Sequence, residues 1–279
     1  MYLRVPCCYQ GGKQRIASLV VERILSEADS EANFYDLCCG SGAISIELLN
    51  QGVSPERITM LDSSSWGAFW KKIGSGAFDF LFFDELITRI PTDKKNIQPF
   101  MQELSLEPID NHEAEIYIVL QANSFGGKQI WLENGKWKNA FFRSFWQPTP
   151  TSIRRSVANP MQPSPVELQK RVIDLSIAMK GVNVIKDDIS SILDTKLYSK
   201  DVVYVDPPYK GSTGYGFGFD LRRFIDDFYS INDNFLFVSE GRKISEDAVL
   251  LPLNGANGGI SGRRKNKHEE WLNLFNVTH

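Results

Sequence analysis

The stretch from residue 33 to residue 62 constrains the fold more than any other part of the chain. An apolar run leads to Asp36, the glycine-rich turn Gly40–Gly42 follows, and a helical apolar pattern begins directly after this turn. A second apolar run then ends at Asp62. Strand, tight turn, helix and strand in this order predict a right-handed crossover unit with two parallel strands.

The C-terminal part of the chain continues the alternation of short apolar runs with helical patterns. We expect helices near 166–180 and 219–230, strands at 182–186, 202–205 and 234–239, and two further strands in AVLLPL and EEWLNLF. Strands that alternate with helices predict an α/β fold, with a mostly parallel, Rossmann-like sheet covered on both faces.

Residues 63–164 lack this regularity. They contain a polar helical pattern near 96–107, apparent hairpins around 116–147, and a run of prolines toward their end. A change of pattern bounded by prolines indicates an inserted domain and its exit linker. We therefore predict a core domain made of 1–62 and 165–279, with residues 63–164 inserted between its halves.

Composition narrows the class of protein. No apolar run approaches the roughly 20 residues that span a bilayer, and the N-terminus lacks the apolar region of a secretory signal. The four cysteines form two adjacent pairs, whereas zinc ligands are spaced by two to four residues. We expect a cytoplasmic protein without a membrane partner and without a metal.

The motif Asp206-Pro207-Pro208-Tyr209 directly follows the apolar run VVYV. Ligands of open α/β sheets bind at the carboxyl ends of strands, which is where this motif falls. The lone pair of an amine on a nucleobase is delocalised, and two acceptors, the Asp206 carboxylate and the Pro207 carbonyl, would favour a more nucleophilic nitrogen. Tyr209 offers a flat face for an extruded base. The alternative is a proline-stiffened loop after a buried strand.

Three further patterns are compatible with a bound nucleoside cofactor. Glycines at 40 and 42 permit close approach of a ligand to the backbone, and Asp62 ends the next strand, where a carboxylate can accept from ribose hydroxyls. The segment YQGGK (9–13) combines an aromatic residue, glycines and a lysine before a helix. Asp188 follows a predicted strand. Read separately, these are equally an ordinary turn, a flexible loop and a helix N-cap.

Residues 120–160 are strongly basic. Six basic residues stand against the single acid Glu133, so the stretch carries +5 while the rest of a chain of net charge −3 carries −8. The basic residues are Lys128, Lys136, Lys138, Arg143, Arg154 and Arg155. Aromatic residues lie between them, which suits contacts with phosphates and bases. The alternative is a small domain with its own aromatic core and a solvated charged face.

Taken together, the motifs resemble those of the Dam-type adenine-specific DNA methyltransferases, in the family's order. They are YQGGK, DLCCGSG, LDSS, the hairpin-like NSFGGKQIWLENGKWKN, KDDI and DPPY. The sequence departs from the family at Cys38-Cys39, which replace a Phe-containing pair, at Ile189, where an aromatic is common, and at Lys128, where leucine is usual.

The resemblance implies a class I S-adenosylmethionine-dependent methyltransferase fold with a target-recognition insertion at 63–164. It implies methyl transfer from S-adenosyl-L-methionine to the N6 amine of adenine in double-stranded DNA. The catalytic residues would be Asp206, Pro207 and Tyr209. The cofactor-binding residues would be Tyr9, Gly12, Lys13, Asp36, Gly40, Gly42, Asp62, Asp188 and Asp206. The DNA-binding residues would be Asn123, Lys128, Lys138, Arg143, Arg154 and Arg155.

Other functions stay open at this point. Methylation of RNA or of the cytosine N4 amine uses related chemistry, although serine is more common than Asp206 at the first motif position in cytosine enzymes. A DNA-binding module with a vestigial cofactor site is the non-enzymatic alternative. A cognate restriction endonuclease is a second partner that the sequence neither requires nor excludes.

Overall fold

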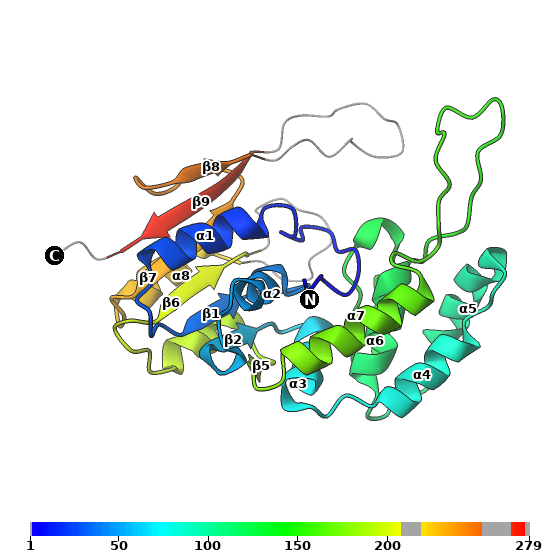
Figure 1. Ribbon diagram of the computed structural model, residues 1–279, viewed down its shortest axis with the longest axis horizontal. Coiled ribbons are helices and arrows are strands. Elements are labelled where there is room, and N and C mark those ends of the chain that lie inside the picture. Colours follow the sequence, from blue (N-terminus) through cyan, green and yellow to red (C-terminus); the bar gives the residue numbers. More distant parts are fainter. Residues whose placement is uncertain (1, 208–218, 253–268, 277–279) are drawn as a thin grey trace.

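The computed structural model describes residues 2–207, 219–252 and 269–276. Its centre is a seven-stranded mixed sheet with the order β5-β2-β1-β6-β7-β9-β8, shown in Figure 1. The strands are β1 (Phe34–Leu37), β2 (Ile58–Leu61), β5 (Asn183–Ile185), β6 (Val202–Val205), β7 (Phe235–Glu240), β8 (Val249–Leu251) and β9 (Glu270–Phe275). Among these seven strands, β9 runs opposite to the other six, which share one direction. The expected α/β class with a mostly parallel sheet is confirmed.

Alternating side chains of the central strands enter two separate cores. On β6, Val202 and Tyr204 join one core, and Val203 and Val205 join the other. The helices α1 (Ala17–Glu27), α2 (Ala43–Asn50) and α3 (Ser65–Ser75) contribute to the first core, and α8 (Leu221–Tyr229) with the 3₁₀ turn η4 (Ile189–Asp194) to the second. The sheet is therefore covered on both faces, as fully apolar strands such as VVYV require.

The order of the parallel strands reverses between β1 and β6. Leading away from this point, β1, β2 and β5 follow one another on one side, and β6 and β7 on the other. Ligands of open α/β sheets bind outside the carboxyl ends of the strands at such a reversal. The register pairs Leu37 with Val205, so the segments that begin at Cys38 and Asp206 start side by side.

Beside the sheet, the chain forms a group of helices (Figure 1). These are α4 (Phe80–Arg89), α5 (Ile97–Leu104), α6 (Glu113–Asn123) and α7 (Pro165–Ala178), with a hairpin of β3 (Trp131–Glu133) and β4 (Lys136–Lys138). Although α3 begins inside the segment expected as an insertion, it packs against β5 of the sheet and also against α6. One continuous apolar core therefore runs from the sheet into the helices.

The hairpins expected around 116–147 are confirmed only in part. The hairpin at 131–138 is present, and Asn134 and Gly135 turn it with positive φ. The expectation was wrong for EIYIVL, which lies in helix α6 and is buried on all sides. A helix enclosed by neighbours loses the 3.6-residue period that identifies an amphipathic helix, so its apolar run resembles a buried strand.

The segment between β4 and α7 forms a long excursion, which we call the arm (residues 143–160). Figure 1 shows it in green, projecting away from the helices. A bridge between Trp146 and Ala158 joins its two sides, and a second bridge between Ser124 and Phe142 holds its base. Pro148, Pro150 and Pro160 therefore belong to this projecting structure, whereas Pro165 begins α7.

The contact of α3 with the sheet yields a prediction at Gly74. Replacing glycine by alanine inside a helix normally stabilises it by about 1 kcal/mol. Here a Cβ would lie 2.4 Å from the Val182 carbonyl oxygen. We expect Gly74→Ala to destabilise the protein by about 1–3 kcal/mol instead, because backbone has to move. Urea unfolding measures this change. Ser75→Ala, at the exposed next position, is the control, and a stabilised Gly74→Ala would contradict the packing.

Candidate active site

The glycine turn after β1 is closely packed by the protein itself. Gly40 and Gly42 have φ of 48° and 71°, which side chains rarely adopt. A Cβ would lie 2.9 Å from the Tyr9 ring at Gly40 and 2.6 Å from the Trp70 ring at Gly42. The Trp70 indole also donates to the Gly40 carbonyl oxygen at 2.8 Å. Two aromatic rings therefore fix the path of this turn.

Asp62, directly after β2, is tied to the same turn. Its Oδ2 accepts from the Gly40 N–H at 2.8 Å, and its Oδ1 accepts from the N–H and hydroxyl of Ser64 at 2.9 and 2.5 Å. Burial raises the pKa of the Asp62 carboxyl, against the lowering effect of these hydrogen bonds. The two groups that the sequence linked to a nucleoside cofactor thus lie in contact.

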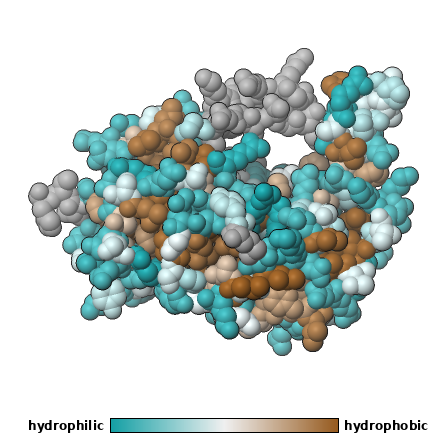
Figure 2. All heavy atoms as spheres, viewed as in Figure 1, coloured by the Kyte–Doolittle hydropathy of each residue, from teal (hydrophilic) through white to brown (hydrophobic). Residues whose placement is uncertain are grey.

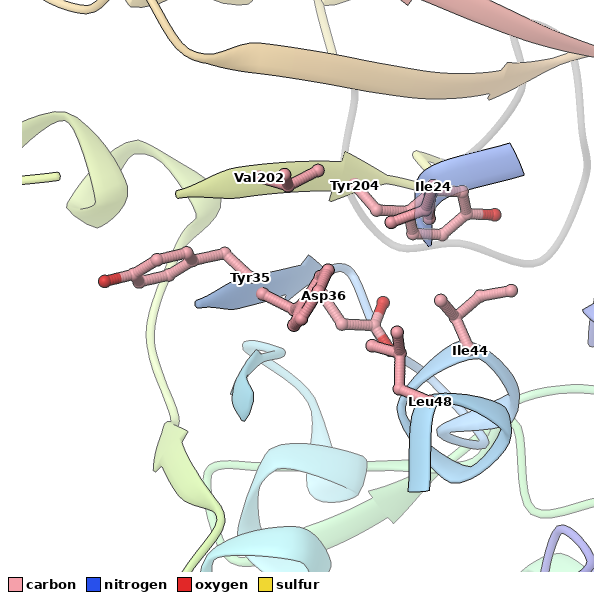
Figure 3. Close-up of a pocket in the computed structure, with 8 residues that line it drawn as sticks. Ile24, Tyr35, Asp36, Ile44, Leu48, Val202 and Tyr204 are labelled. Atoms are coloured by element: carbon pink, nitrogen blue, oxygen red, sulfur yellow. The ribbon is translucent and has the colours of Figure 1, made fainter. Parts of the chain in front are cut away.

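Asp36 lies beneath the turn and faces α2. Its Oδ2 accepts from the N–H of Ser45 at 3.2 Å and from the Ser45 hydroxyl at 2.7 Å. Burial raises the pKa of this carboxyl to about 7, although both hydrogen bonds lower it. Figure 3 shows Asp36 pointing toward α2, beside a small, mainly apolar cavity that Ile44 and Tyr204 also line. This cavity belongs to the core between the sheet and its helices. The candidate site instead lies at the carboxyl ends of the parallel strands.

At the end of β6, Asp206 forms an ion pair with Lys13. The Lys13 Nζ donates to Asp206 Oδ1 at 2.7 Å, and a second acid, Glu270, has its Oε1 3.5 Å from the same Nζ. Burial raises the pKa of Asp206 to about 6, Lys13 opposes this rise, and the charges of Glu270 and Glu240 add to it. The sequence interpretation missed Glu270; its only signal was an acid at the start of an otherwise apolar strand.

The N-terminal segment (residues 8–13) connects this edge with the base of the arm. Its Tyr9 ring meets Trp66 edge-on at 5.4 Å between ring centroids. Its backbone donates from Cys8 to the Gln162 carbonyl oxygen at 3.1 Å and from Gln10 to that of Gly127 at 2.7 Å. In Figure 1 it runs, in dark blue, between the sheet and the helices. Tyr9, Gly12 and Lys13 therefore reach the sheet edge from a distant part of the sequence.

Other expected site residues lie elsewhere or outside the described residues. Asp188 is exposed and caps η4, accepting from the N–H and hydroxyl of Ser190 at 2.9 and 2.7 Å. These hydrogen bonds lower the pKa of Asp188. Pro207 is described and buried, whereas Tyr209 lies outside the described residues.

The residues expected to bind DNA divide into two groups. Asn123 is fully buried and donates from Nδ2 to the Pro160 carbonyl oxygen at 2.6 Å, so it stabilises the base of the arm and is not a surface residue. Half-buried Arg143 donates to the Ser124 carbonyl oxygen at 3.3 Å, and its burial lowers its pKa. Lys138 is 42% exposed, but its Nζ lies 3.5 Å from Glu133 Oε2, so its charge is paired at the surface.

The other group is available at the surface. Lys128 and Arg155 are exposed, and Arg154 is partly exposed with its guanidinium 5.7 Å from the centre of the Trp146 ring. Exposed apolar side chains accompany them: Phe125, Phe141, Trp146, Ile153 and Val157. Figure 2 shows hydrophobic and hydrophilic residues next to one another on the arm. On the arm itself, Arg154 and Arg155 are thus exposed together with Trp146, Ile153 and Val157.

A scan of the sequence against protein-family models found no match, and a comparison with curated proteins found none either. Within the described residues, no group of three or more histidine, cysteine or acidic side chains is arranged to hold a metal ion. None of the helices in the described ranges is long and apolar enough to cross a membrane.

The raised pKa of Asp36 gives a testable pH dependence. The folded chain keeps the Asp36 proton up to about pH 7, but an ordinary carboxyl with a pKa of 3.8 has lost it. The folded state therefore binds more protons in this window, and the free energy of unfolding falls as pH rises through it. Asp36→Asn removes this contribution, so its slope between pH 5 and 7 should be flatter, by at most about 1.4 kcal/mol per pH unit.

Denaturant unfolding at pH 5, 6 and 7 measures these slopes. Asp226→Asn, which neutralises an exposed carboxyl on α8, is the matched control and should keep the wild-type slope. An Asp36→Asn slope equal to that of the wild type would contradict the burial of a titrating carboxyl at this position.

Proposed function

We propose that the protein transfers a methyl group from S-adenosyl-L-methionine to the N6 amine of adenine in double-stranded DNA. One observation carries the proposal: Asp206 and the Asp62-bound glycine turn follow strands on the two sides of the point where the strand order reverses. A nucleoside cofactor and an amine substrate need two such acceptor sites close together. The motif order shared with the Dam-type enzymes supports the same assignment.

The acceptors present fit the ribose of the cofactor. A carboxylate offers about four acceptor positions, and three contacts already fall on Asp62. One ribose hydroxyl can therefore be accepted directly, and a second would replace the hydroxyl of Ser64. Charge-assisted hydrogen bonds are roughly twice as strong as neutral ones, so the directly accepted hydroxyl favours binding. The exchange at Ser64 is close to neutral, because its hydroxyl already donates to the same carboxylate.

The charge of the site fits a cationic ligand. Asp36, Asp62, Asp206 and Glu270 lie at or beneath the sheet edge, with Lys13 among them. Like charges near one another raise the pKa of Asp36 and Asp206, beyond the effect of burial. A positive sulfonium would relieve this repulsion. When bound, S-adenosyl-L-methionine supplies a methyl group on an already activated leaving group.

The residues of the DPPY motif would orient the amine. Asp206 offers a carboxylate whose ionised form Lys13 stabilises, and the Pro207 carbonyl offers the second acceptor. Two acceptors on the amine hydrogens favour the geometry from which nitrogen attacks a methyl carbon. Tyr209, outside the described residues, would stack on the flipped base.

The arm would contact the DNA backbone. The basic stretch that contains it carries +5, whereas the remainder of the chain carries −8 and would repel a polyanion. Arg154 and Arg155 are available for phosphates, and Trp146 and Ile153 for apolar contacts with the duplex. Binding through this segment would bring the target base toward Asp206 by way of the adjoining N-terminal segment.

Asp206→Asn tests the proposed reaction. Asparagine keeps the shape but loses the charge and one acceptor, so we expect methyl transfer from labelled cofactor to adenine-containing duplex to fall about 100-fold or more. In the wild type, activity should fall as the pH drops through about 6, because protonated Asp206 no longer accepts. Asp226→Asn should retain wild-type turnover.

Near-normal turnover of Asp206→Asn would overturn the assignment of this carboxylate. RNA of the same sequence, and duplexes in which cytosine is the only methylatable base, serve as competing substrates. Transfer to either of these in preference to adenine in duplex DNA would overturn the proposed substrate.

The role of the arm gives a separate prediction. Phosphate contacts release counterions, so log affinity falls with log salt, with a slope that measures the number of contacts. Arg154→Ala with Arg155→Ala should flatten this slope by roughly 1 per lost contact. Arg222→Ala with Arg223→Ala removes the same charge from exposed positions on α8 and should leave the slope unchanged. Equal slopes for the two double variants would show that the arm does not touch the backbone.

A further inference from the structure

Glu270 is a buried acid that the proposed chemistry does not yet use. It is the first residue of β9, and only 8% of its side chain is exposed. Because β9 runs antiparallel to β7, its start lies at the edge where the parallel strands end. Strand direction therefore brings Glu270 to the Asp206 side of the sheet, although the two residues are distant in sequence.

Glu270 forms an ion pair with Lys13, whose ammonium group it shares with Asp206. A lysine ammonium has three donors. Among the described residues, Asp206 Oδ1 lies 2.7 Å from Nζ, the Gly11 carbonyl oxygen 3.4 Å and Glu270 Oε1 3.5 Å. Lysine has a long flexible stem, so several acceptors within reach of its ammonium group restrict where its charge can lie. The Lys13 side chain is itself 8% exposed, which leaves little space for other positions.

We propose that Glu270 is a positioning residue for methyl transfer, which holds the Lys13 ammonium where it orients the Asp206 carboxylate. This inference rests on the proposed function, since it assigns Glu270 to the same reaction. Lys13 donates to Oδ1, so the place of its Nζ sets the direction in which the Asp206 carboxylate faces. Without the second acid, Nζ keeps its contact with Asp206 but loses one of the acceptors that restrict its position.

The charges predict that removing Glu270 and removing Lys13 have unequal effects on stability. Removing the charge of Glu270 leaves Lys13 paired with Asp206. Removing Lys13 leaves the buried Glu270 and the partly buried Asp206 carboxylates without their shared cation, which is far more costly. Glu270→Gln should therefore fold well enough for kinetics, and Lys13→Gln should be the less stable of the two variants.

A pure field effect on Asp206 is the competing explanation. Glu240, at the end of β7, also raises the pKa of Asp206 through its charge. Its Oε1 accepts from the N–H of Gly241 at 2.8 Å, and its side chain is half-exposed. Glu240→Gln is thus a matched control, because it removes a like charge near Asp206 while leaving the three acceptors around Lys13 in place.

The experiment compares the kinetics of Glu270→Gln and Glu240→Gln at a pH well above the acid limb. We expect Glu270→Gln to lower kcat by about 10- to 100-fold, because small displacements of a catalytic group have effects of this size. KM for DNA should stay within about twofold of the wild-type value, since the duplex binds through the arm. Glu240→Gln should keep kcat within about twofold.

A double-mutant cycle tests whether Glu270 acts through Lys13. If it does, Glu270→Gln should cause little further loss of kcat in a Lys13→Gln background. A second readout does not require turnover: the Lys13 ammonium protons should exchange with water faster in Glu270→Gln, as followed by NMR. This readout also applies if Lys13→Gln does not fold.

The outcomes separate this inference from the proposed function. An active wild type, an inactive Asp206→Asn and a fully active Glu270→Gln would overturn only the role of Glu270. Equal losses of kcat in Glu270→Gln and Glu240→Gln would show a field effect and also overturn it. A wild type that methylates no nucleic acid would overturn the proposed function, whereas the exchange of the Lys13 protons would still test the positioning.

Discussion

The parallel pairing of β1 with β6 is the constraint on which the rest of the site depends. The two strands are neighbours in register, and the N–H of Asp206 donates to the Leu37 carbonyl oxygen at 3.2 Å. The ladder thus continues to the first residue of the DPPY motif and fixes its backbone beside the glycine turn. A shift of one residue in this pairing would turn every side chain of β6 to the opposite face. Both apolar cores would then be lost together with the site.

Several acidic side chains, Asp36, Asp62, Asp206 and Glu270, are buried or partly buried around this strand pairing. Carboxylates buried near one another would be costly if all were ionised, and the raised pKa values of Asp36 and Asp206 express this cost. Lys13 compensates part of it from the N-terminal segment. Among the residues that the structure describes, these acids outnumber the cation Lys13, so a cationic ligand would be stabilised here. The cofactor that we propose carries such a positive charge on its sulfonium.

Much of the fold could be predicted from the sequence, since most of the strands are short, bounded and apolar. The strands ending at Leu37, Leu61 and Val205 were located, and with them the glycine turn and Asp62. Helix α6 could not be identified, because burial on all sides removes the periodicity that distinguishes a helix from a strand. Asn123 was expected at a DNA surface, but a motif position carries no information about burial, and its side chain bonds to backbone inside the arm's base.

The sequence by itself determined which groups follow each strand, because local apolar runs and glycines fix where strands end. It therefore determined that Asp62, Asp206 and the glycine turn lie at strand termini. Only the tertiary structure decided which of these termini meet, since strand order and direction depend on packing between distant segments. The antiparallel direction of β9 brings Glu270 to Lys13, and the path of the N-terminal segment brings Lys13 to Asp206. Neither contact has a local sequence signal, because an ion pair between distant residues forms only when the sheet has placed both of them.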